Sequence, residues 1–187
     1  MDWIVFGLGK SIHQLTREEA KEYNTLGVND IFATHDVDHL VIPDRWDRFT
    51  EPRLQTIAKS TPKTLWLKET RSFPGLEEHP DVRHYKVAKW NGFWSLDLPE
   101  DTVPYCYISP FIASAIAWKY LNAERIGIIG VDLLTDHHQH KNAHILNPCF
   151  KILREKLLER GTELVNLSAE SKLTALPFKP LSFIGKK

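Results

Sequence analysis

The chain has 187 residues, and its 24 lysines and arginines are balanced by 24 aspartates and glutamates. A hydrophobic content of 42% is enough for a core and excludes wholesale disorder. The zero formal net charge argues against a protein whose main task is to grip nucleic acid phosphates, and the length predicts a single domain over residues 1–187.

The first third of the chain alternates apolar runs with helix signals. Trp3–Phe6 is a continuous apolar run that ends at Gly7, which is typical of a buried parallel strand entering a turn. Thr16, with Glu19 three residues later, has the pattern of a capping box and predicts a short helix that ends near Asn24. Strands are also expected at 25–29, 39–42 and 63–68, and a helix at 52–60.

Residues 69–104 form an irregular stretch. It is rich in chain-breaking residues, among them Pro74, Pro80, Pro99 and Pro104. Because a structureless loop of this length is unusual in a compact domain, we expect an insertion here that forms a hairpin or a flap through residues 85–87.

The remaining third returns to alternating helices and strands. The expected elements are a helix from Ser109 or Pro110 to Tyr120, a strand over 125–132, a helix with Asn147 as its cap, Pro148 at its first position and Gly161 at its end, and a strand over 163–166. This alternation predicts an α/β fold, a three-layer Rossmann-like arrangement with a mostly parallel sheet. In such a sheet a ligand binds at the carboxyl ends of the strands, near the change in strand order.

The turn after the first strand is rich in glycine. Gly7 and Gly9 would let a ligand approach the backbone, and Lys10 and Ser11 follow directly. Neither the dinucleotide fingerprint nor the P-loop pattern is complete, because positions 12 and 4 hold isoleucine where those patterns need glycine. Two interpretations stay open: a phosphate or nucleotide contact, or a tight turn that needs glycine for its geometry alone.

Polar side chains follow several of the expected strands. Asn29 and Asp30 follow the second strand, Asp44 follows the third, and Asp132 ends the strand that closes in Gly-Val-Asp. Each alone is commonly a turn former or a helix cap. Together they lie at the same edge of a parallel sheet, which indicates a ligand crevice there.

The segment from His35 to His39 alternates polar and apolar residues. On an extended chain His35 and His39 face one way with Val37, and Asp36 and Asp38 face the other way together. Such a carboxylate pair could hold Mg²⁺ or Mn²⁺, and a solvated edge segment is the alternative.

A second group of histidines follows the Gly-Val-Asp strand. His137, His138, His140 and His144 lie within eight residues, in the loop expected over the crevice. Their candidate roles are general base, phosphate contact and metal ligand, and the alternative is a polar surface loop.

The location of the protein follows from what the sequence lacks. Cys106 and Cys149 cannot build a disulfide framework or a CxxC zinc site, although one bridge between them stays open, and scarce cysteine suits a reducing cytosol. The apolar run at the N-terminus covers only residues 3–6, too few for a signal peptide, and no stretch approaches a membrane span. We expect a cytoplasmic protein with no membrane partner.

These motifs, in this order, resemble a known superfamily. The sequence is similar to the Rossmann-like bacterial sialyltransferase-type glycosyltransferases of family 42 and to the archaeal 6-hydroxymethylpterin diphosphokinase-like proteins. The motifs that carry the resemblance are the glycine turn 7–12, Asn29, the helix start at 108–110 with Ser114, the strand end 130–132, the stretch 140–142, and the closing segments 166–168 and 171–173.

The resemblance implies a nucleotide bound at the glycine turn, Asn29, Ser109 and Asp132. It places a general base, which takes the proton of an acceptor hydroxyl, on His140, with His138 or His144 as alternatives. The glycosyltransferase branch needs no metal, whereas the diphosphokinase-like branch uses ATP and Mg²⁺.

The leading hypothesis is therefore a small glycosyltransferase-like enzyme with a nucleotide or nucleotide-sugar donor, positioned by the residues above and by Asp44. One alternative is a Mg²⁺-dependent phosphotransfer enzyme that uses Asp36, Asp38 or Asp44. The other is a non-catalytic module that sequesters or senses a nucleotide. A homo-oligomer is an open alternative for a domain of this size, and no nucleic acid partner is expected.

Overall fold

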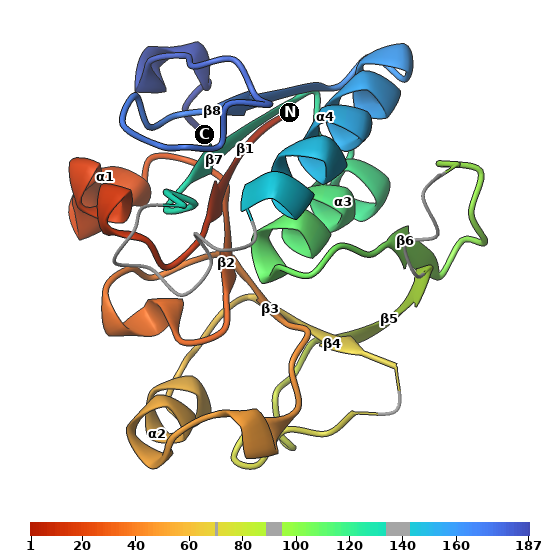
Figure 1. Cartoon of the computed structure of the whole chain (residues 1–187). Helices are drawn as coiled ribbons and strands as arrows, with labels where there is room; N and C mark the ends of the chain where they lie inside the picture. The colour runs from red at the N-terminus through yellow and green to blue at the C-terminus, as the bar shows by residue number, and fades with distance from the viewer. Residues whose placement is uncertain (70, 89–94, 134–142) are drawn as a thin grey trace.

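The computed structural model of the chain describes residues 1–69, 71–88, 95–133 and 143–187 (Figure 1). Its centre is an eight-stranded sheet in which every pair is parallel, in the order β6-β5-β4-β3-β2-β1-β7-β8. The strands are β1 Asp2–Phe6, β2 Thr25–Val28, β3 His39–Ile42, β4 Thr64–Lys68, β5 Val82–Ala88, β6 Thr102–Pro104, β7 Arg125–Ile129 and β8 Glu163–Asn166. The order reverses between β1 and β7, as in Rossmann-like folds.

Helices cover both faces of this sheet, so the predicted three-layer α/β fold is confirmed (Figure 1). The α-helices are α1 Arg17–Ala20, α2 Glu51–Ala58, α3 Ser109–Leu121 and α4 Ala143–Glu159, and the short 3₁₀ helices are η1 Lys10–Gln14, η2 Ile31–Ala33, η3 Trp46–Arg48 and η5 Leu181–Phe183. α3 and α4 lie on one face, and α1 and α2 lie on the other (Figure 1). Among the described residues, no helix has the length and apolar character needed to cross a bilayer.

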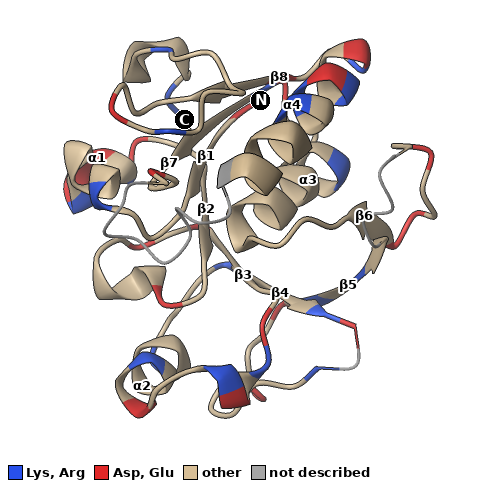
Figure 2. Ribbon diagram, in the orientation of Figure 1, with Lys and Arg blue, Asp and Glu red and all other residues tan. Residues whose placement is uncertain are grey.

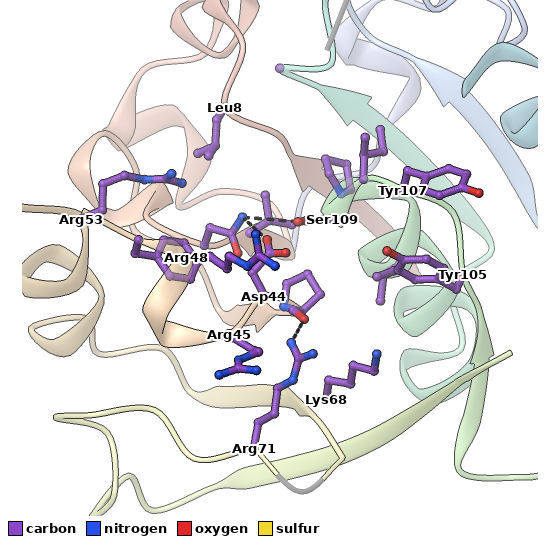
Figure 3. Close-up of a pocket in the computed structure, with 18 residues that line it drawn as sticks. Leu8, Asp44, Arg45, Arg48, Arg53, Lys68, Arg71, Tyr105, Tyr107 and Ser109 are labelled. Atoms are coloured by element: carbon purple, nitrogen blue, oxygen red, sulfur yellow. Dashed lines mark hydrogen bonds between the residues drawn. The ribbon is translucent and has the colours of Figure 1, made fainter. Parts of the chain in front are cut away.

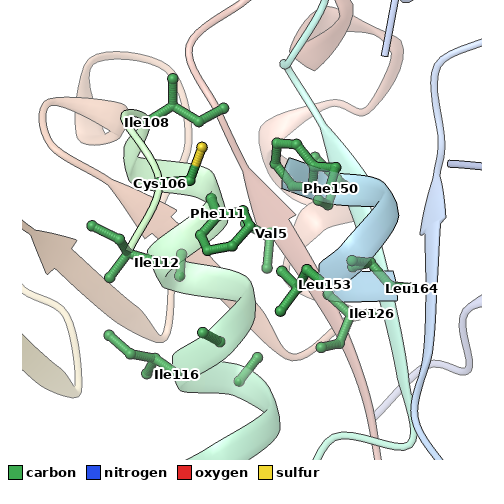
Figure 4. Packing of buried hydrophobic residues seen from close by; sticks show 14 of the residues in the cluster. Val5, Cys106, Ile108, Phe111, Ile112, Ile116, Ile126, Phe150, Leu153 and Leu164 are labelled. Carbon is green, nitrogen blue, oxygen red and sulfur yellow. The ribbon is translucent and has the colours of Figure 1, made fainter. Parts of the chain in front are cut away.

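α3 is apolar on all sides over most of its length, and that part of the helix is buried. All residues from Pro110 to Ala117 are buried, between the sheet and α4. Phe111 of α3 and Phe150 of α4 meet edge to face with ring centroids 5.3 Å apart (Figure 4). The helix is therefore held firmly, and so is its N-terminus at the carboxyl edge of the sheet.

The predicted capping box forms at the start of α1. The Thr16 Oγ1 accepts the Glu19 N–H at 3.2 Å, and the Thr16 N–H donates to the Glu19 carboxylate at 2.8 Å. The helix ends at Ala20, earlier than Asn24, where the sequence pattern had placed its end.

The hairpin expected within 69–104 does not form. Residues 82–88 are β5, which pairs in parallel with β4 on one side and with β6 on the other. A hairpin needs an antiparallel neighbour, so this prediction was wrong, and the stretch extends the main sheet. Tyr85 lies in the middle of β5 and is fully buried against the core.

The helix expected to begin at Pro148 begins earlier. α4 includes Ala143, and Pro148 lies inside it, so the helix lacks the bond that residue 148 would donate to the carbonyl of residue 144. Asn147 does not cap this helix. Its amide donates to the Lys172 carbonyl at 3.1 Å and accepts the Ala175 N–H at 2.9 Å, which ties down the segment after β8.

A half-buried histidine, His39, makes the fold sensitive to acid. The pKa of His39 is lowered to about 4, chiefly by burial; Arg83 and Lys63 also lower it, and Asp38 and Asp81 oppose the shift. The neutral ring accepts the Trp66 indole N–H on Nδ1 at 3.3 Å. In the unfolded chain His39 takes up a proton near pH 6.5, so stability is lost as the pH falls from about 6.5 to 4.

We therefore expect the melting temperature to drop over this pH range, and to drop less in His39→Gln, whose side chain can accept the indole N–H but does not titrate. Thermal unfolding followed by circular dichroism at several pH values measures this. Equal acid slopes in the two proteins would contradict the assignment.

Candidate functional site

A cavity of about 490 Å³ opens at the carboxyl edge of the sheet (Figure 3). Its size falls within the range of small-molecule sites. Residues from six strand ends line it: Leu8 after β1, Asn29 after β2, Asp44 after β3, Lys68 at the end of β4, Tyr105 after β6 and Gly130 after β7. Because all the strands are parallel, these ends converge on one edge, which is where a ligand is expected in such a sheet.

One side of the cavity is formed by cations. This cationic wall consists of Arg45, Arg48, Arg53, Lys68 and Arg71. They come from η3, α2, the end of β4 and the loop after it, and in Figure 3 they lie to the left of and below the central Asp44. Figure 2 shows the blue ribbon of η3 and α2 beside red ribbon from neighbouring acidic residues. The wall is therefore a local feature of a chain with no net charge.

Two of these cations are held by carboxylates. Arg53 makes a two-pronged contact with Asp30, at 3.0 and 2.6 Å, and its guanidinium lies 4.9 Å from the centre of the Phe49 ring. Arg45 pairs with Asp47 at 2.7 Å. Arg53 is thus fixed in place by two partners, as a pre-organised donor needs to be.

The other two arginines of the wall have no carboxylate partner among the described residues. Arg71 donates to the backbone carbonyl of Pro43, which orients its guanidinium and leaves other N–H groups for a ligand. Arg48 ends η3 and is exposed at the cavity. An anion that enters the cavity meets these two groups without displacing a protein carboxylate.

Asn29, Asp44 and Ser109 meet at the floor of the cavity. The Asn29 amide nitrogen lies 3.4 Å from the Asp44 carboxylate and 3.3 Å from the Ser109 hydroxyl (Figure 3). Asn29 is only 7% exposed and has a left-handed backbone with φ of 52°, which asparagine tolerates well. Its Oδ1 finds no hydrogen-bond partner in the described part of the chain. A buried acceptor of this kind is costly unless a ligand or water donates to it.

The N-terminus of α3 closes the cavity beside Asn29. Ile108, Ser109, Pro110 and Ile112 all line it. The first turn of a 13-residue helix carries N–H groups without helical partners and the positive end of the helix dipole. This end of the cavity also favours a negatively charged ligand.

The glycine turn has used several of its N–H groups inside the protein. The Gly7 N–H donates to the Ile129 carbonyl at 2.8 Å, and the Gly9 N–H donates to the Gly130 carbonyl at 2.7 Å. The turn is therefore bound to the end of β7 over its first residues.

Asp132 completes this connection. Its carboxylate is buried and accepts the Ser11 N–H at 2.9 Å and the Ser11 hydroxyl, while the Ser11 Oγ accepts the Gly130 N–H at 2.9 Å. These bonds fasten η1 to the end of β7 behind the cavity. Ser11 and Asp132, both predicted as nucleotide contacts, thus bond to each other.

The predicted nucleotide-binding residues therefore divide into two groups. Asn29, Asp44 and Ser109 line the cavity. The others, Gly7, Gly9, Lys10, Ser11 and Asp132, lie next to it in and beside the glycine turn and are not among its lining residues. A ligand role for the second group stays a prediction.

The predicted catalytic histidines are placed only in part. His144 is exposed in the first turn of α4. His138 and His140 lie outside the described residues. Their assignment as general base stays a prediction from the sequence.

The two carboxylates of the segment 35–39 do not form a pair. Asp36 pairs with Arg17, whereas Asp38 pairs with Lys63 and Lys187, both at 2.7 Å. Asp38 immediately precedes β3, at the edge of the sheet opposite the cavity. The described residues contain no group of acidic, histidine or cysteine side chains fit to hold a metal ion. Asp36 and Asp38 thus have separate basic partners, and of the three acids in the Mg²⁺ hypothesis only Asp44 lines the cavity.

His35 has a structural role in the same segment. It is buried, its Nε2 lies 2.7 Å from the Leu15 carbonyl, and its ring stacks on Phe6 with centroids 5.0 Å apart. The alternation in this segment reflects packing against the face of β1 that carries Phe6, on the side of α1 and α2.

Two tyrosines stand opposite the cationic wall (Figure 3). This tyrosine wall consists of Tyr105 and Tyr107, which meet edge to face with centroids 6.0 Å apart. Burial raises the pKa of Tyr105, and the nearby Asp44 carboxylate raises it further, so its hydroxyl stays protonated. The Lys68 ammonium lies 5.9 Å from the centre of the Tyr105 ring and connects the two walls.

Comparisons with known proteins returned nothing for this chain: a scan against protein-family models, a search of curated proteins and a search of solved structures found no match.

Proposed function

We propose that this chain is a small transferase whose phosphorylated donor, a nucleotide or a nucleotide sugar, binds in the cavity at the carboxyl edge of the sheet. The observation that carries the proposal is the cationic wall, with Arg48 and Arg71 free of carboxylate partners among the described residues and facing a cavity of about 490 Å³. Planar guanidinium groups bind phosphate oxygens with two parallel hydrogen bonds, which makes arginine the common residue for this task.

Further features of the cavity support the same ligand class. The α3 N-terminus adds a second anion-favouring element. Asn29 Oδ1 and the Asp44 carboxylate accept hydrogen bonds, so they suit the hydroxyl groups of a sugar. A ligand with phosphate at one end and hydroxyl groups at the other matches both the anion-favouring elements and these hydrogen-bond acceptors.

The proposed chemistry transfers a group from the donor to an acceptor hydroxyl. The acceptor oxygen bonds to the transferred group, and the bond between that group and the phosphate oxygen of the donor breaks. The proton of the acceptor passes to a histidine base, for which His140 is the prediction with His138 and His144 as alternatives. The phosphate leaves with the electron pair, and the cationic wall stabilises its charge.

Thermal unfolding with a panel of nucleotides and nucleotide sugars tests the binding step. A ligand present at 100 times its Kd stabilises the fold by about 2.7 kcal/mol, which raises the melting temperature of a chain of this size by roughly 5–10 °C. We expect such a rise with at least one phosphorylated ligand and no comparable rise with the matching nucleoside. If no phosphorylated ligand shifts the transition, the proposed function is wrong.

The same panel separates the alternatives. Loss of the shift in EDTA would favour the Mg²⁺-dependent phosphotransfer enzyme, with Asp44 as the acid at the cavity. For the transferase, we expect His140→Ala to keep the melting shift and to reduce donor consumption at least about 100-fold, the usual contribution of a general base. A donor that binds tightly but is never consumed, with any acceptor offered, would instead identify a non-catalytic binding module.

A further inference from the structure

We infer that the tyrosine wall, chiefly Tyr107, holds the planar base of a nucleotide whose phosphate lies against the cationic wall. The inference rests on the proposed function, and it deepens it by naming the residues that hold the base of the nucleotide or nucleotide-sugar donor.

The first observation is the exposure of Tyr107. Its side chain lines the cavity yet is 60% exposed, although the residues on either side of it, Cys106 and Ile108, are buried. Tyrosine is enriched at contact surfaces, because its ring is apolar while its hydroxyl can stay in water. Packing of the fold does not account for its position.

The second observation is how the ring is held. The one ring contact of Tyr107 in the described part of the chain is the edge-to-face contact with Tyr105. Tyr105 is itself half-buried and lies beneath the Lys68 ammonium. Tyr105 therefore supports Tyr107, and no other aromatic ring among these residues contacts the Tyr107 ring.

The third observation is the separation of the two walls. In Figure 3 the two tyrosines lie to the right of the cavity, while Arg48, Arg45 and Arg71 lie to the left and below, with Asp44 between them. A ligand that spans the cavity thus meets an aromatic face at one end, hydrogen-bond acceptors in the middle and guanidinium groups at the other end. Base, sugar and phosphate follow one another in that order in a nucleotide.

The size of the expected effect follows from base stacking. Stacking of a base on an aromatic side chain contributes about tenfold to affinity and depends little on which base is present, because every base has a π face. The tyrosine wall should therefore raise the affinity for nucleotides over an otherwise identical ligand without a base.

Isothermal titration with AMP, CMP, GMP and UMP, and with ribose 5-phosphate, tests the inference. Ribose 5-phosphate carries the same sugar and phosphate but no base. We expect the best nucleotide to bind the wild-type protein about tenfold more tightly than ribose 5-phosphate. We expect Tyr107→Leu to remove this ratio while leaving the Kd of ribose 5-phosphate within twofold, and Tyr107→Phe to keep the ratio. Phe178→Leu is the control, because Phe178 is 52% exposed but lies outside the cavity.

Each result decides between the two proposals. Equal affinity for ribose 5-phosphate and every nucleotide would overturn the inference and leave phosphate binding intact. A Tyr107→Leu variant that keeps the affinity ratio would also overturn the inference. The same holds if the variant loses affinity for the nucleotide and for ribose 5-phosphate to the same extent. If neither ribose 5-phosphate nor any nucleotide binds, the proposed function fails, and the inference fails with it.

Discussion

Gly7→Ala is expected to lower the free energy of unfolding by about 3 kcal/mol, the upper end of the cost of overpacking. A Cβ at position 7 would lie 2.3 Å from the Gly130 carbonyl oxygen and 2.8 Å from its carbon. Both are backbone atoms, and the neighbouring bond from the Gly7 N–H to the Ile129 carbonyl holds the two segments at this distance. No side chain can rotate away to relieve the contact, so β1 and β7 must separate at the edge that carries the cavity.

Denaturant unfolding of both proteins measures this difference, and Gly161→Ala is its control. Gly161 has a φ of 80° but nothing lies within 4 Å of its added Cβ, so it tests backbone strain without crowding. We expect a loss of about 1 kcal/mol there. A Gly7→Ala protein that is no less stable than Gly161→Ala would mean that the turn needs glycine for a ligand and not for its own packing.

This outcome bears on how the glycine turn was interpreted from sequence. The pattern left open whether the glycines serve a phosphate or the geometry of the turn. The structure supplies a geometric reason for Gly7 and for Gly9, whose added Cβ would lie 2.6 Å from an Asp132 carboxylate oxygen. Sequence could not show this, because Asp132 is 121 residues from Ser11, the residue to which it is bonded.

Most of the sheet could be predicted because its central strands are buried on both faces. β1, β3 and β4 are apolar runs, so each can be recognised from its own residues without knowledge of the strands that pair with it. For β5, only a hairpin or flap through residues 85–87 was predicted, because Arg83, His84 and Lys86 are exposed along the strand and its seven residues resemble a polar loop. Its strand character comes from pairing with β4 and β6, which a local pattern does not contain.

Only those cavity residues that follow a strand could be predicted, because ligands bind at the carboxyl ends of parallel strands. Asn29 and Asp44 were found because they follow strands. The cationic wall was missed because Arg45 and Arg48 alternate with Asp44 and Asp47, so the segment looks neutral. Only the fold shows which of these charges form an ion pair. Asp47 pairs with Arg45, and Arg48 lines the cavity. The position of Lys68 at the end of a strand was the one local signal that could have indicated the wall.

Removal of Arg48 and Arg71, which have no carboxylate partner in the part of the chain that the structure describes, is expected to have the largest effect on ligand binding. A hydrogen bond to a charged group contributes about 1.5–3 kcal/mol, so Arg48→Ala and Arg71→Ala should each weaken the Kd of a nucleotide by roughly 10- to 100-fold. If the two arginines act independently, the double variant should lose about 1,000-fold. The dependence of the Kd on salt should weaken as well, because fewer charges are neutralised on binding.

The matched control is Arg83→Ala. Arg83 is an exposed arginine on β5 that pairs with Asp81 at 3.1 Å and lies outside the cavity, so its removal changes the net charge equally without touching the ligand. Titration of the three variants and the double variant, with the unfolding transition of each recorded, separates local contact from overall charge. Arg71 also donates to the Pro43 carbonyl. The variant Arg71→Lys keeps the positive charge without the guanidinium, so it shows how much of the loss in affinity comes from the geometry of Arg71 and how much from its charge. A uniform loss in all variants, Arg83→Ala included, would assign the affinity to net charge and remove the arginine pair from the site.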